Sequence, residues 1–282
     1  MPVLKNVRHM LVAFAVAMSA PAGALAQPVL KIFDSHLHYN VEATSAYSLD
    51  SVIELFRRNG IGGIVANSRP NRGSQMLVEA KAQGLWVVPF IRPYRVPSDV
   101  QNWFNDPAIY ELIETEYKRG YYKGVGEFHL HGEEYRSPWV KKIVDFAVER
   151  DLYMLAHSDE QAILGLFSLN PKAKVIWAHT GFSGPEARVR EMLDTYPTLW
   201  AELSYRSGIS NGRGISAEWR DLFARHANRF LLGSDTWVNQ RWSSYESTMR
   251  EYRGWLADLP ADQARLIAHG NAERLYGGKI EP

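Results

Sequence analysis

The sequence of 282 residues predicts a (β/α)8 barrel. Three observations lead to this fold class. Short apolar segments alternate eight times with helix-like segments, several of the predicted helices end at a glycine, and polar side chains directly follow the apolar segments. The size is suitable, because 46% of the residues are hydrophobic and such barrels commonly form one domain of about 250 residues. A doubly wound open sheet is the alternative, but no Gly-x-Gly-x-x-Gly motif follows the first apolar segment.

The first four predicted units each consist of a strand and a helix. Their strands are short apolar runs, as expected where both faces of a strand are buried. Gly60, Gly84 and Gly120 follow the first three helices, and glycine readily adopts the left-handed conformation that ends a helix. The predicted strand and helix ranges are 30–33 and 49–59, 61–66 and 74–83, 85–91 and 107–119, and 123–128 and 139–150.

The last four predicted units follow the same pattern. Asn170-Pro171 ends the helix of the fifth unit, because proline cannot continue a helix. The eighth strand is followed by two helices. The predicted ranges are 152–156 and 160–169, 174–178 and 185–195, 199–203 and 217–227, and 229–233 with helices at 245–256 and 261–276.

The N-terminal residues have the features of an export signal. Lys5 and Arg8 precede an apolar run over residues 10–18, which is too short to span a bilayer, and Ala24-Leu25-Ala26 fits the cleavage rule for small residues. We therefore expect a periplasmic or secreted protein. The expected units are a secretory signal peptide at residues 1–26 and a single barrel domain at residues 27–282.

Charge and cysteine content narrow the possible partners and ligands. With 32 basic and 31 acidic residues, the chain has no overall attraction for nucleic acid or for an anionic membrane. The expected partner is a small molecule, with no nucleic acid and no membrane after signal cleavage; the sequence does not indicate an oligomeric state. Because the chain contains no cysteine, any metal site must use histidines and carboxylates.

Polar residues at the ends of the predicted strands indicate such a metal site. His36-Leu37-His38 follows the first apolar segment, and side chains two residues apart in a strand point to the same face. Imidazole is a common ligand of zinc and other first-row metals. In a barrel, the carboxyl ends of all strands meet at one mouth. Four later strands supply further candidates: Glu127, His157, His179 and Asp235.

These motifs together resemble the amidohydrolase superfamily of metal-dependent barrels. The resemblance extends from Phe33 to Tyr276 and includes the opening Asp34-Ser35-His36-Leu37-His38 and the closing Gly270-Asn271-Ala272-Glu273-Arg274-Leu275-Tyr276. It implies a first metal ion held by His36, His38 and Asp235. It also implies that Glu127 bridges to a second ion held by His157 and His179. Zn²⁺ is the expected ion, with Mn²⁺ or another first-row metal as the alternative.

The number of ions is open, although two are favoured over one. Many members with two metals use a carboxylated lysine at strand four, where this chain has Glu127. Lys123 has the same parity, but it lies about 13 Å away at about 3.3 Å per residue. The alternative is a single ion held by His36, His38, His157 and Asp235, with His179 acting as a base or an electrophile, as in the decarboxylase and hydratase members.

The resemblance implies a metal-dependent hydrolase. Metal-activated water would attack a small ester, lactone, amide or phosphoester, and Asp235 would accept a proton from that water. His179, where it is not a ligand, would polarise the scissile bond. The alternative function is a single-metal lyase, a decarboxylase or hydratase that acts on an unsaturated or aromatic carboxylic acid. A nuclease and a non-catalytic binding protein are less favoured.

Residues near the predicted mouth are candidate substrate contacts. Arg92 and Arg206 directly follow strands, and arginine can bind a carboxylate or phosphate with two hydrogen bonds, so an anionic substrate is one expectation. Trp237, together with Tyr205 and Trp103, could form an aromatic wall.

Other polar residues have more ordinary interpretations. Glu202 ends the seventh apolar segment, where a buried salt bridge is expected. His129 and His131 share a face with Glu127, but a solvated loop is the more common setting. His226 and His269 lie away from the strand ends and are interpreted as structural.

Overall fold

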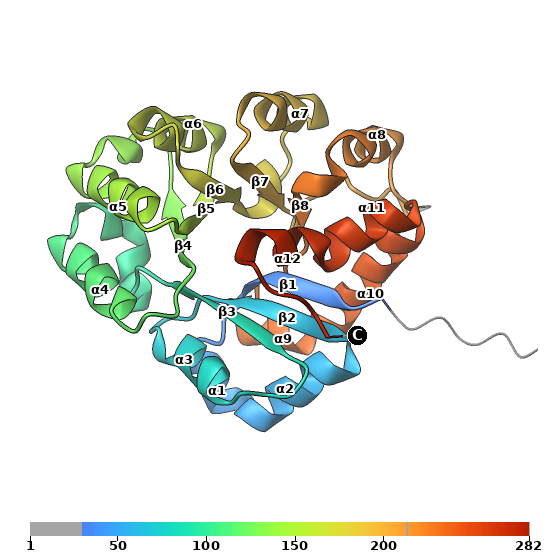
Figure 1. Ribbon diagram of the computed structural model, residues 1–282, viewed down its shortest axis with the longest axis horizontal. Coiled ribbons are helices and arrows are strands. Elements are labelled where there is room, and N and C mark those ends of the chain that lie inside the picture. The colour runs from blue at the N-terminus through green and yellow to red at the C-terminus, as the bar shows by residue number, and fades with distance from the viewer. Residues whose placement is uncertain (1–29, 213, 282) are drawn as a thin grey trace, which may run out of the picture.

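The computed structural model describes residues 30–212 and 214–281, and these form a barrel of eight parallel strands (Figure 1). The predicted fold class is therefore confirmed. The predicted signal peptide lies outside the described residues. Each strand pairs with the next one along the chain. The strands are β1 (Ile32–Leu37), β2 (Ile61–Ala66), β3 (Trp86–Ile91), β4 (Gly124–Leu130), β5 (Tyr153–Ser158), β6 (Lys174–Trp177), β7 (Leu199–Glu202) and β8 (Phe230–Leu231).

The barrel closes between its first and last strands. The backbone N–H of Ser35 donates to the carbonyl of Leu232 at 2.7 Å, and that of Asp235 donates to the carbonyl of His36 at 2.6 Å. The second of these bonds joins two candidate metal ligands through their backbones. Closure of the sheet therefore also fixes Asp235 beside β1.

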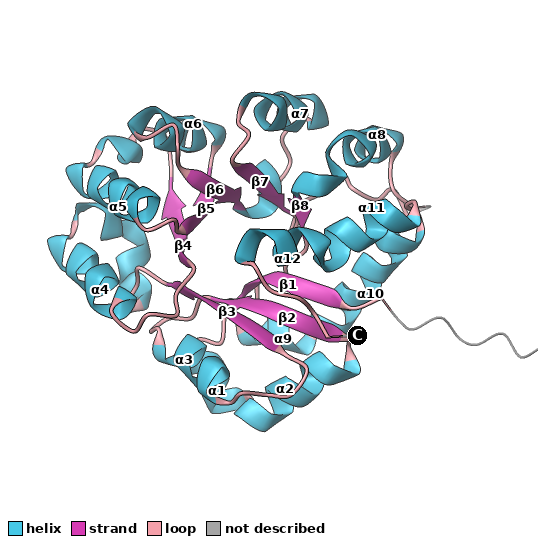
Figure 2. Cartoon of the chain, viewed as in Figure 1, coloured by secondary structure: helices cyan, strands magenta, loops and turns pink. Residues whose placement is uncertain are grey.

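Helices form an outer layer around the strands (Figure 2). Two short helices that follow strand ends, α1 and α9, were not predicted. The predicted helix at 261–276 is divided by a π-helical turn, η6 (Leu266–Gly270). Among the described residues, no helix is long and apolar enough to cross a membrane. The helices are α1 (Val41–Ala46), α2 (Leu49–Arg58), α3 (Arg72–Glu79), α4 (Pro107–Tyr117), α5 (Pro138–Glu149), α6 (Glu160–Leu169), α7 (Glu186–Thr195), α8 (Ala217–His226), α9 (Asn239–Ser243), α10 (Tyr245–Ala257), α11 (Ala261–Arg265) and α12 (Asn271–Tyr276).

An aromatic cluster inside the barrel closes its amino-terminal end. Helix α12 lies across the ring of strands in the view of Figure 1. It places the ring of Tyr276 at 5.7 Å from that of Phe33 and at 5.9 Å from that of Phe90. Aliphatic side chains of other strands, including Leu155 and Ile176, complete this inner core. Side chains of this cluster therefore fill the interior of the barrel at this end.

Strand β1 is longer than predicted and contains an irregularity in register between Asp34 and Leu37. Phe33 packs inside the barrel, whereas Leu37 belongs to the outer core. The buried carboxylate of Asp34 accepts the backbone N–H of His36 at 3.3 Å and the hydroxyl of Tyr245 at 2.9 Å. Such irregularities in strands can redirect side chains next to a site. Here the irregularity accompanies the entry of His36 and His38 into the mouth of the barrel.

The close approach of α3 to the segment after β1 gives a stability prediction. A Cβ atom on Gly73 would lie 1.8 Å from the carbonyl oxygen of Tyr39 and 2.8 Å from Cβ of Ser68. We expect Gly73→Ala to lower the free energy of unfolding by about 1–3 kcal/mol, because the backbone must shift to relieve this overlap. Thermal and urea unfolding followed by circular dichroism measure the change.

Gly254→Ala is the matched control. Gly254 is exposed in α10, and a Cβ atom there would meet nothing within 4 Å. This variant should be more stable than the wild type by about 0.5–1 kcal/mol, because alanine favours a helix over glycine. Equal stability of the Gly73→Ala variant and the wild type would contradict the close packing at α3.

Candidate metal centre

The six candidate ligands converge at the carboxyl ends of the strands. All are buried except His157, which is partly exposed. They form two groups that share Glu127. The residues and their positions are His36 and His38 in β1, Glu127 in β4, His157 in β5, His179 in the turn η4 (Ala178–Gly181), and Asp235 after β8.

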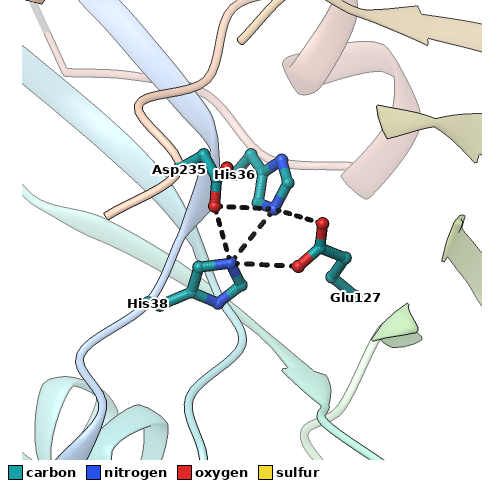
Figure 3. Close-up of side chains that lie close together, drawn as sticks. All are labelled: His36, His38, Glu127 and Asp235. Atoms are coloured by element: carbon teal, nitrogen blue, oxygen red, sulfur yellow. Dashed lines mark hydrogen bonds and ion pairs between the residues drawn. The ribbon is translucent and has the colours of Figure 1, made fainter. Parts of the chain in front are cut away.

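The first group consists of His36, His38, Glu127 and Asp235 (Figure 3). The two Nε2 atoms of the histidines are 3.1 Å apart. Oδ1 of Asp235 lies 3.0 Å from Nε2 of His38 and 3.5 Å from Nε2 of His36. The two oxygens of Glu127 lie at 3.5 Å from Nε2 of His36 and 3.3 Å from Nε2 of His38. Potential donor atoms of four residues therefore lie within 4.8 Å of one another.

The second group consists of Glu127, His157 and His179. Oε1 of Glu127 lies 2.9 Å from Nδ1 of His157 and 3.5 Å from Nε2 of His179. The two histidine nitrogens are 3.2 Å apart. Because its oxygens contact both groups, Glu127 occupies the position between two potential ion sites.

Three of the four histidines are held from behind through Nδ1. Nδ1 of His38 lies 2.6 Å from the carbonyl oxygen of Asn67, and Nδ1 of His179 lies 2.9 Å from that of Ser204. Nδ1 of His36 lies 3.0 Å from Oε2 of Glu202. An oxygen acceptor at Nδ1 favours the tautomer with hydrogen on Nδ1 and directs the lone pair of Nε2 to the centre. At His38, Nη1 of Arg92 also lies 2.7 Å from Nδ1 and 3.0 Å from Nε2. The rings are thus oriented as metal ligands usually are.

The donor atoms fit a divalent ion in type and spacing. Oδ1 of Asp235 is buried and receives no hydrogen bond. It faces Nε2 of His36 and of His38, which present lone pairs when their hydrogens are on Nδ1. Buried lone pairs that face one another repel unless a cation lies between them. Donors bound to zinc at about 2.1 Å in a tetrahedron are about 3.4 Å apart, close to the separations of 3.0–3.5 Å found here.

Both carboxylates of the first group are ionised at neutral pH. Burial alone raises the pKa of Asp235, but in the metal-free protein His36 is protonated, and its positive charge outweighs the effect of burial and brings the pKa of Asp235 to about 2. Burial likewise opposes ionisation of Glu127, and the charges of His36 and Arg92 hold its pKa well below its usual range. The centre therefore presents two negative charges to a cation.

The backbone around the centre is strained. Seven described residues other than glycine have positive φ angles, and five of them lie directly after strands at the mouth. Side chains with a Cβ atom adopt this conformation at a cost of roughly 1–2 kcal/mol each. Such strain is concentrated at functional sites, where it holds side chains in position. The five residues are His179, Thr180, Phe182, Tyr205 and Asp235.

A cavity of about 520 Å³ opens above the centre. It is large enough for a small-molecule ligand. Glu127, His157, His179 and Asp235 are exposed to it at the base. The remaining lining residues are Asn40, Arg69, Arg92, Tyr94, Pro97, Val100, His129, Phe182, Tyr205 and Trp237.

Two of the three predicted substrate contacts line this cavity. Trp237 lies at the rim, 53% exposed, and its indole N–H donates to the hydroxyl of Tyr205 at 3.1 Å. Arg92 lies deeper, where Nη2 is 3.0 Å from Oε2 of Glu127 and Nη1 donates to Oδ1 of Asn67 at 2.9 Å. The Arg92 side chain can therefore contact a substrate at the place in the cavity where the candidate ligands lie.

The third predicted contact, Arg206, lies elsewhere, and so does Trp103 of the predicted aromatic wall. The guanidinium of Arg206 donates to the carbonyls of Phe182 and Gly184 and stacks over Trp219 at 4.9 Å, so it supports a loop behind the cavity. Trp103 is fully buried beneath β4, and its indole N–H donates to the carbonyl of His129 at 2.6 Å. Neither residue is among those that line the cavity.

Several residues at the centre were missed or undervalued. Asn67 directly follows the apolar strand β2, so the same strand-end pattern could have identified it. His129 lines the cavity, and its Nδ1 lies 3.0 Å from the hydroxyl of Tyr94. Burial lowers the pKa of His129 to about 3, so it is neutral at physiological pH. Tyr94, three residues after β3, gave no comparable signal.

The remaining histidines lie away from the centre. His131 is exposed and lies 4.0 Å from Asp159. His226 pairs with Asp194 at 3.0 Å, and His269 lies 3.3 Å from Glu273. These contacts give the three residues roles in the surrounding structure.

Solved structures share the fold of this chain at low sequence identity. An amidohydrolase from Burkholderia multivorans with bound zinc has a TM-score of 0.58 and 16% identity, with 88% of this chain and 100% of that chain covered. A putative 2-pyrone-4,6-dicarboxylic acid hydrolase from Pseudomonas putida has a TM-score of 0.59 and 18% identity, with coverage of 89% and 99%. YjjV, a TatD homolog from Escherichia coli K12, has a TM-score of 0.61 and 17% identity, with the same coverage. At these identities the likeness shows the fold alone.

Family assignment comes from the sequence itself. No curated protein matches the chain. The model of a family described as amidohydrolase matches residues 103–278, which is more than half of the chain and includes four of the six candidate ligands. Together with the barrel and the histidine–carboxylate centre, this match shows that the chain belongs to the amidohydrolase family.

Proposed function

We propose that this metal-dependent amidohydrolase uses metal-activated water to cleave a small ester, lactone, amide or phosphoester. The observation that carries the proposal is the convergence of three lone-pair atoms at 3.0–3.5 Å: Nε2 of His36, Nε2 of His38 and Oδ1 of Asp235. The cavity above them has room for a small substrate. The predicted export signal would place this reaction in the periplasm or outside the cell.

In this proposal His36, His38 and Asp235 would hold the first ion. Glu127 would be shared with a second ion, which His157 and His179 would hold. Two ions are favoured, because Glu127 contacts both groups through its carboxylate. Zn²⁺ is the preferred ion, since histidine and carboxylate donors suit it and a structure of similar fold carries bound zinc.

The side chains have distinct chemical tasks. When bound, the metal lowers the pKa of water to about 7 and so supplies a nucleophile at neutral pH. Asp235 would accept a proton from the attacking water and pass it to the leaving group, because its ionised carboxylate borders the cavity. Glu127 is less available as a base, since Arg92 and His157 both contact its oxygens. Arg92, Tyr205 and Trp237 line the space for the rest of the substrate.

Arg92 favours one alternative function, a single-metal lyase that acts on an unsaturated or aromatic carboxylic acid. Its guanidinium already pairs with Glu127, which reduces the need for a second cation there. In that case His179 would be free of metal and would act as a base or an electrophile. Arginine near the centre would also suit an anionic lactone, and the Pseudomonas putida structure of similar fold is named for a dicarboxylic acid substrate.

Metal removal provides the test of the proposed function. Purified protein should hydrolyse at least one member of a panel of esters, lactones, amides and phosphoesters. A chelator should abolish this activity, and Zn²⁺ or Mn²⁺ should restore it. Activity that survives complete metal removal would overturn the proposal. Elemental analysis distinguishes the alternatives, because two ions per chain favour the hydrolase and one ion favours the lyase.

We expect His36→Ala to lose most of the bound metal, because the three residues that remain in the first group cannot replace the missing imidazole. Elemental analysis of the purified variant measures the loss. His226→Ala is the control, since His226 is also buried but pairs with Asp194 away from the centre. A His36→Ala variant with the full metal content of the wild type would refute the assigned ligand.

We expect Asp235→Asn to keep much of its metal but to lose turnover. The amide retains an oxygen donor but cannot accept a proton, and such proton transfer typically contributes about 10²–10⁴-fold to the rate. Steady-state kinetics on the best substrate of the panel, together with metal analysis, test this role. Activity above a few per cent of the wild type in the metal-loaded variant would rule out Asp235 as the essential base.

A further inference from the structure

Glu202, the last residue of β7, contacts both histidine groups from outside the cavity. Its side chain is fully buried. Oε2 lies 3.0 Å from Nδ1 of His36 and accepts the backbone N–H of His179 at 3.2 Å. The two histidines belong to different candidate ion sites, so a single carboxylate connects both sites.

The oxygens of Glu202 are fully used by these contacts and by Ser204. Oε1 accepts the backbone N–H of Ser204 at 2.6 Å, and Oε2 accepts its hydroxyl at 2.8 Å. Glu202 is not among the residues that line the cavity. His36, His179 and Glu202 can be grouped as potential ligands of one ion, but Nδ1 of His36 points to Glu202 while Nε2 points to the other group. The geometry therefore fits a residue that forms hydrogen bonds to the ligands better than a residue that binds the metal directly.

Ser204 extends the same support to His179. Its carbonyl oxygen lies 2.9 Å from Nδ1 of His179, and its hydroxyl oxygen lies 3.0 Å from the same atom. The hydroxyl of Thr180, next to His179, donates to the carbonyl of Glu202 at 2.7 Å. Glu202 thus holds His36 directly and holds His179 through its backbone and through Ser204.

The neighbouring strand leaves room for this arrangement. A Cβ atom on Gly233, just after β8, would lie 2.4 Å from Oε1 of Glu202 and 2.5 Å from Cβ of His36. Any larger residue at this position would separate the carboxylate from the imidazole. The close approach of Glu202 to His36 is therefore built into two adjacent strands.

We propose that Glu202 is a positioning residue shared by the two candidate ion sites, which keeps hydrogen on Nδ1 of His36 and sets the position of His179. The expected effect of Glu202 on metal affinity rests on the proposed function. The hydrogen bond between Glu202 and His36 can be tested without metal. Loss of such an outer partner typically weakens metal binding by about 10–100-fold.

Glu202→Gln is the appropriate variant, with Glu116→Gln as its matched control. In one orientation of the new amide its NH2 group faces the N–H of Ser204, and in the other it faces the N–H groups of His179 and His36, so part of the support is lost in either case with little change in volume. Glu116 is also a buried carboxylate; it accepts hydrogen bonds from Gln75, Arg119 and Tyr122, away from the centre. Chelator competition should show about 10–100-fold weaker Zn²⁺ binding for Glu202→Gln and unchanged binding for Glu116→Gln. Equal affinity of Glu202→Gln and the wild type would overturn the proposal.

A second measurement separates this inference from the proposed function. In the metal-free protein, the ring N–H of His36 should give a downfield proton resonance protected from exchange, detected by ¹⁵N-edited NMR. Glu202→Leu, whose side chain has no acceptor for Nδ1–H, should lose this resonance, and Glu116→Leu should keep it. If the wild type binds no metal, the proposed function fails, yet this result still decides the role of Glu202. An unchanged resonance in Glu202→Leu would exclude the positioning contact.

Ser204→Ala keeps the proposal testable if Glu202→Gln does not fold. This variant removes the hydroxyl that contacts both Glu202 and His179 but retains the Ser204 backbone contacts. A smaller loss of Zn²⁺ affinity, about threefold to tenfold, is expected with unchanged secondary structure. Affinity equal to that of the wild type would contradict the proposed support of His179.

Discussion

The centre depends on hydrogen bonds that hold imidazole rings from behind. A neutral imidazole carries one N–H and one lone pair, and only a fixed acceptor at Nδ1 makes Nε2 a dependable ligand. Asn67, Glu202 and Ser204 supply these acceptors to His38, His36 and His179. All three acceptor residues lie at or just after the ends of strands. The carboxyl edge of the barrel therefore carries both the candidate ligands and the residues that orient their rings.

The barrel also determines where this chemistry can take place. Its amino-terminal end is filled by aromatic rings around Tyr276, and its carboxyl end carries the buried carboxylates and histidines. Burial of ionised groups is unfavourable unless they are paired. The apolar core and the charged centre are therefore separated along the axis of the barrel, with the cavity on the charged side. Arg92 contributes a positive charge within the centre and partly balances Glu127 and Asp235.

Much of the fold followed from sequence pattern, because apolar runs bounded by turn residues are local signals. The ranges predicted for β2 and α6 agree with the structure, and the strand-end rule brought six separate residues to one mouth. The rule could not show which side chains turn inward. Arg206 and Arg92 both follow strands, yet only Arg92 reaches the cavity, because its orientation depends on partners distant in sequence. The register irregularity in β1 and the shared contacts of Glu202 likewise depend on tertiary structure.

The positive φ angles at the mouth have a consequence for the evolution and engineering of this protein. Five such residues at roughly 1–2 kcal/mol each represent a sum comparable with the whole stability of a typical domain, about 5–15 kcal/mol. The rest of the barrel must offset that sum, so activity and robustness compete for the same free energy. Glycine or asparagine at a strained mouth position that is not a candidate ligand, such as Tyr205, would relieve part of the strain. Substitutions at the rim of the cavity can therefore raise the stability of the barrel, but they also change the shape of the cavity.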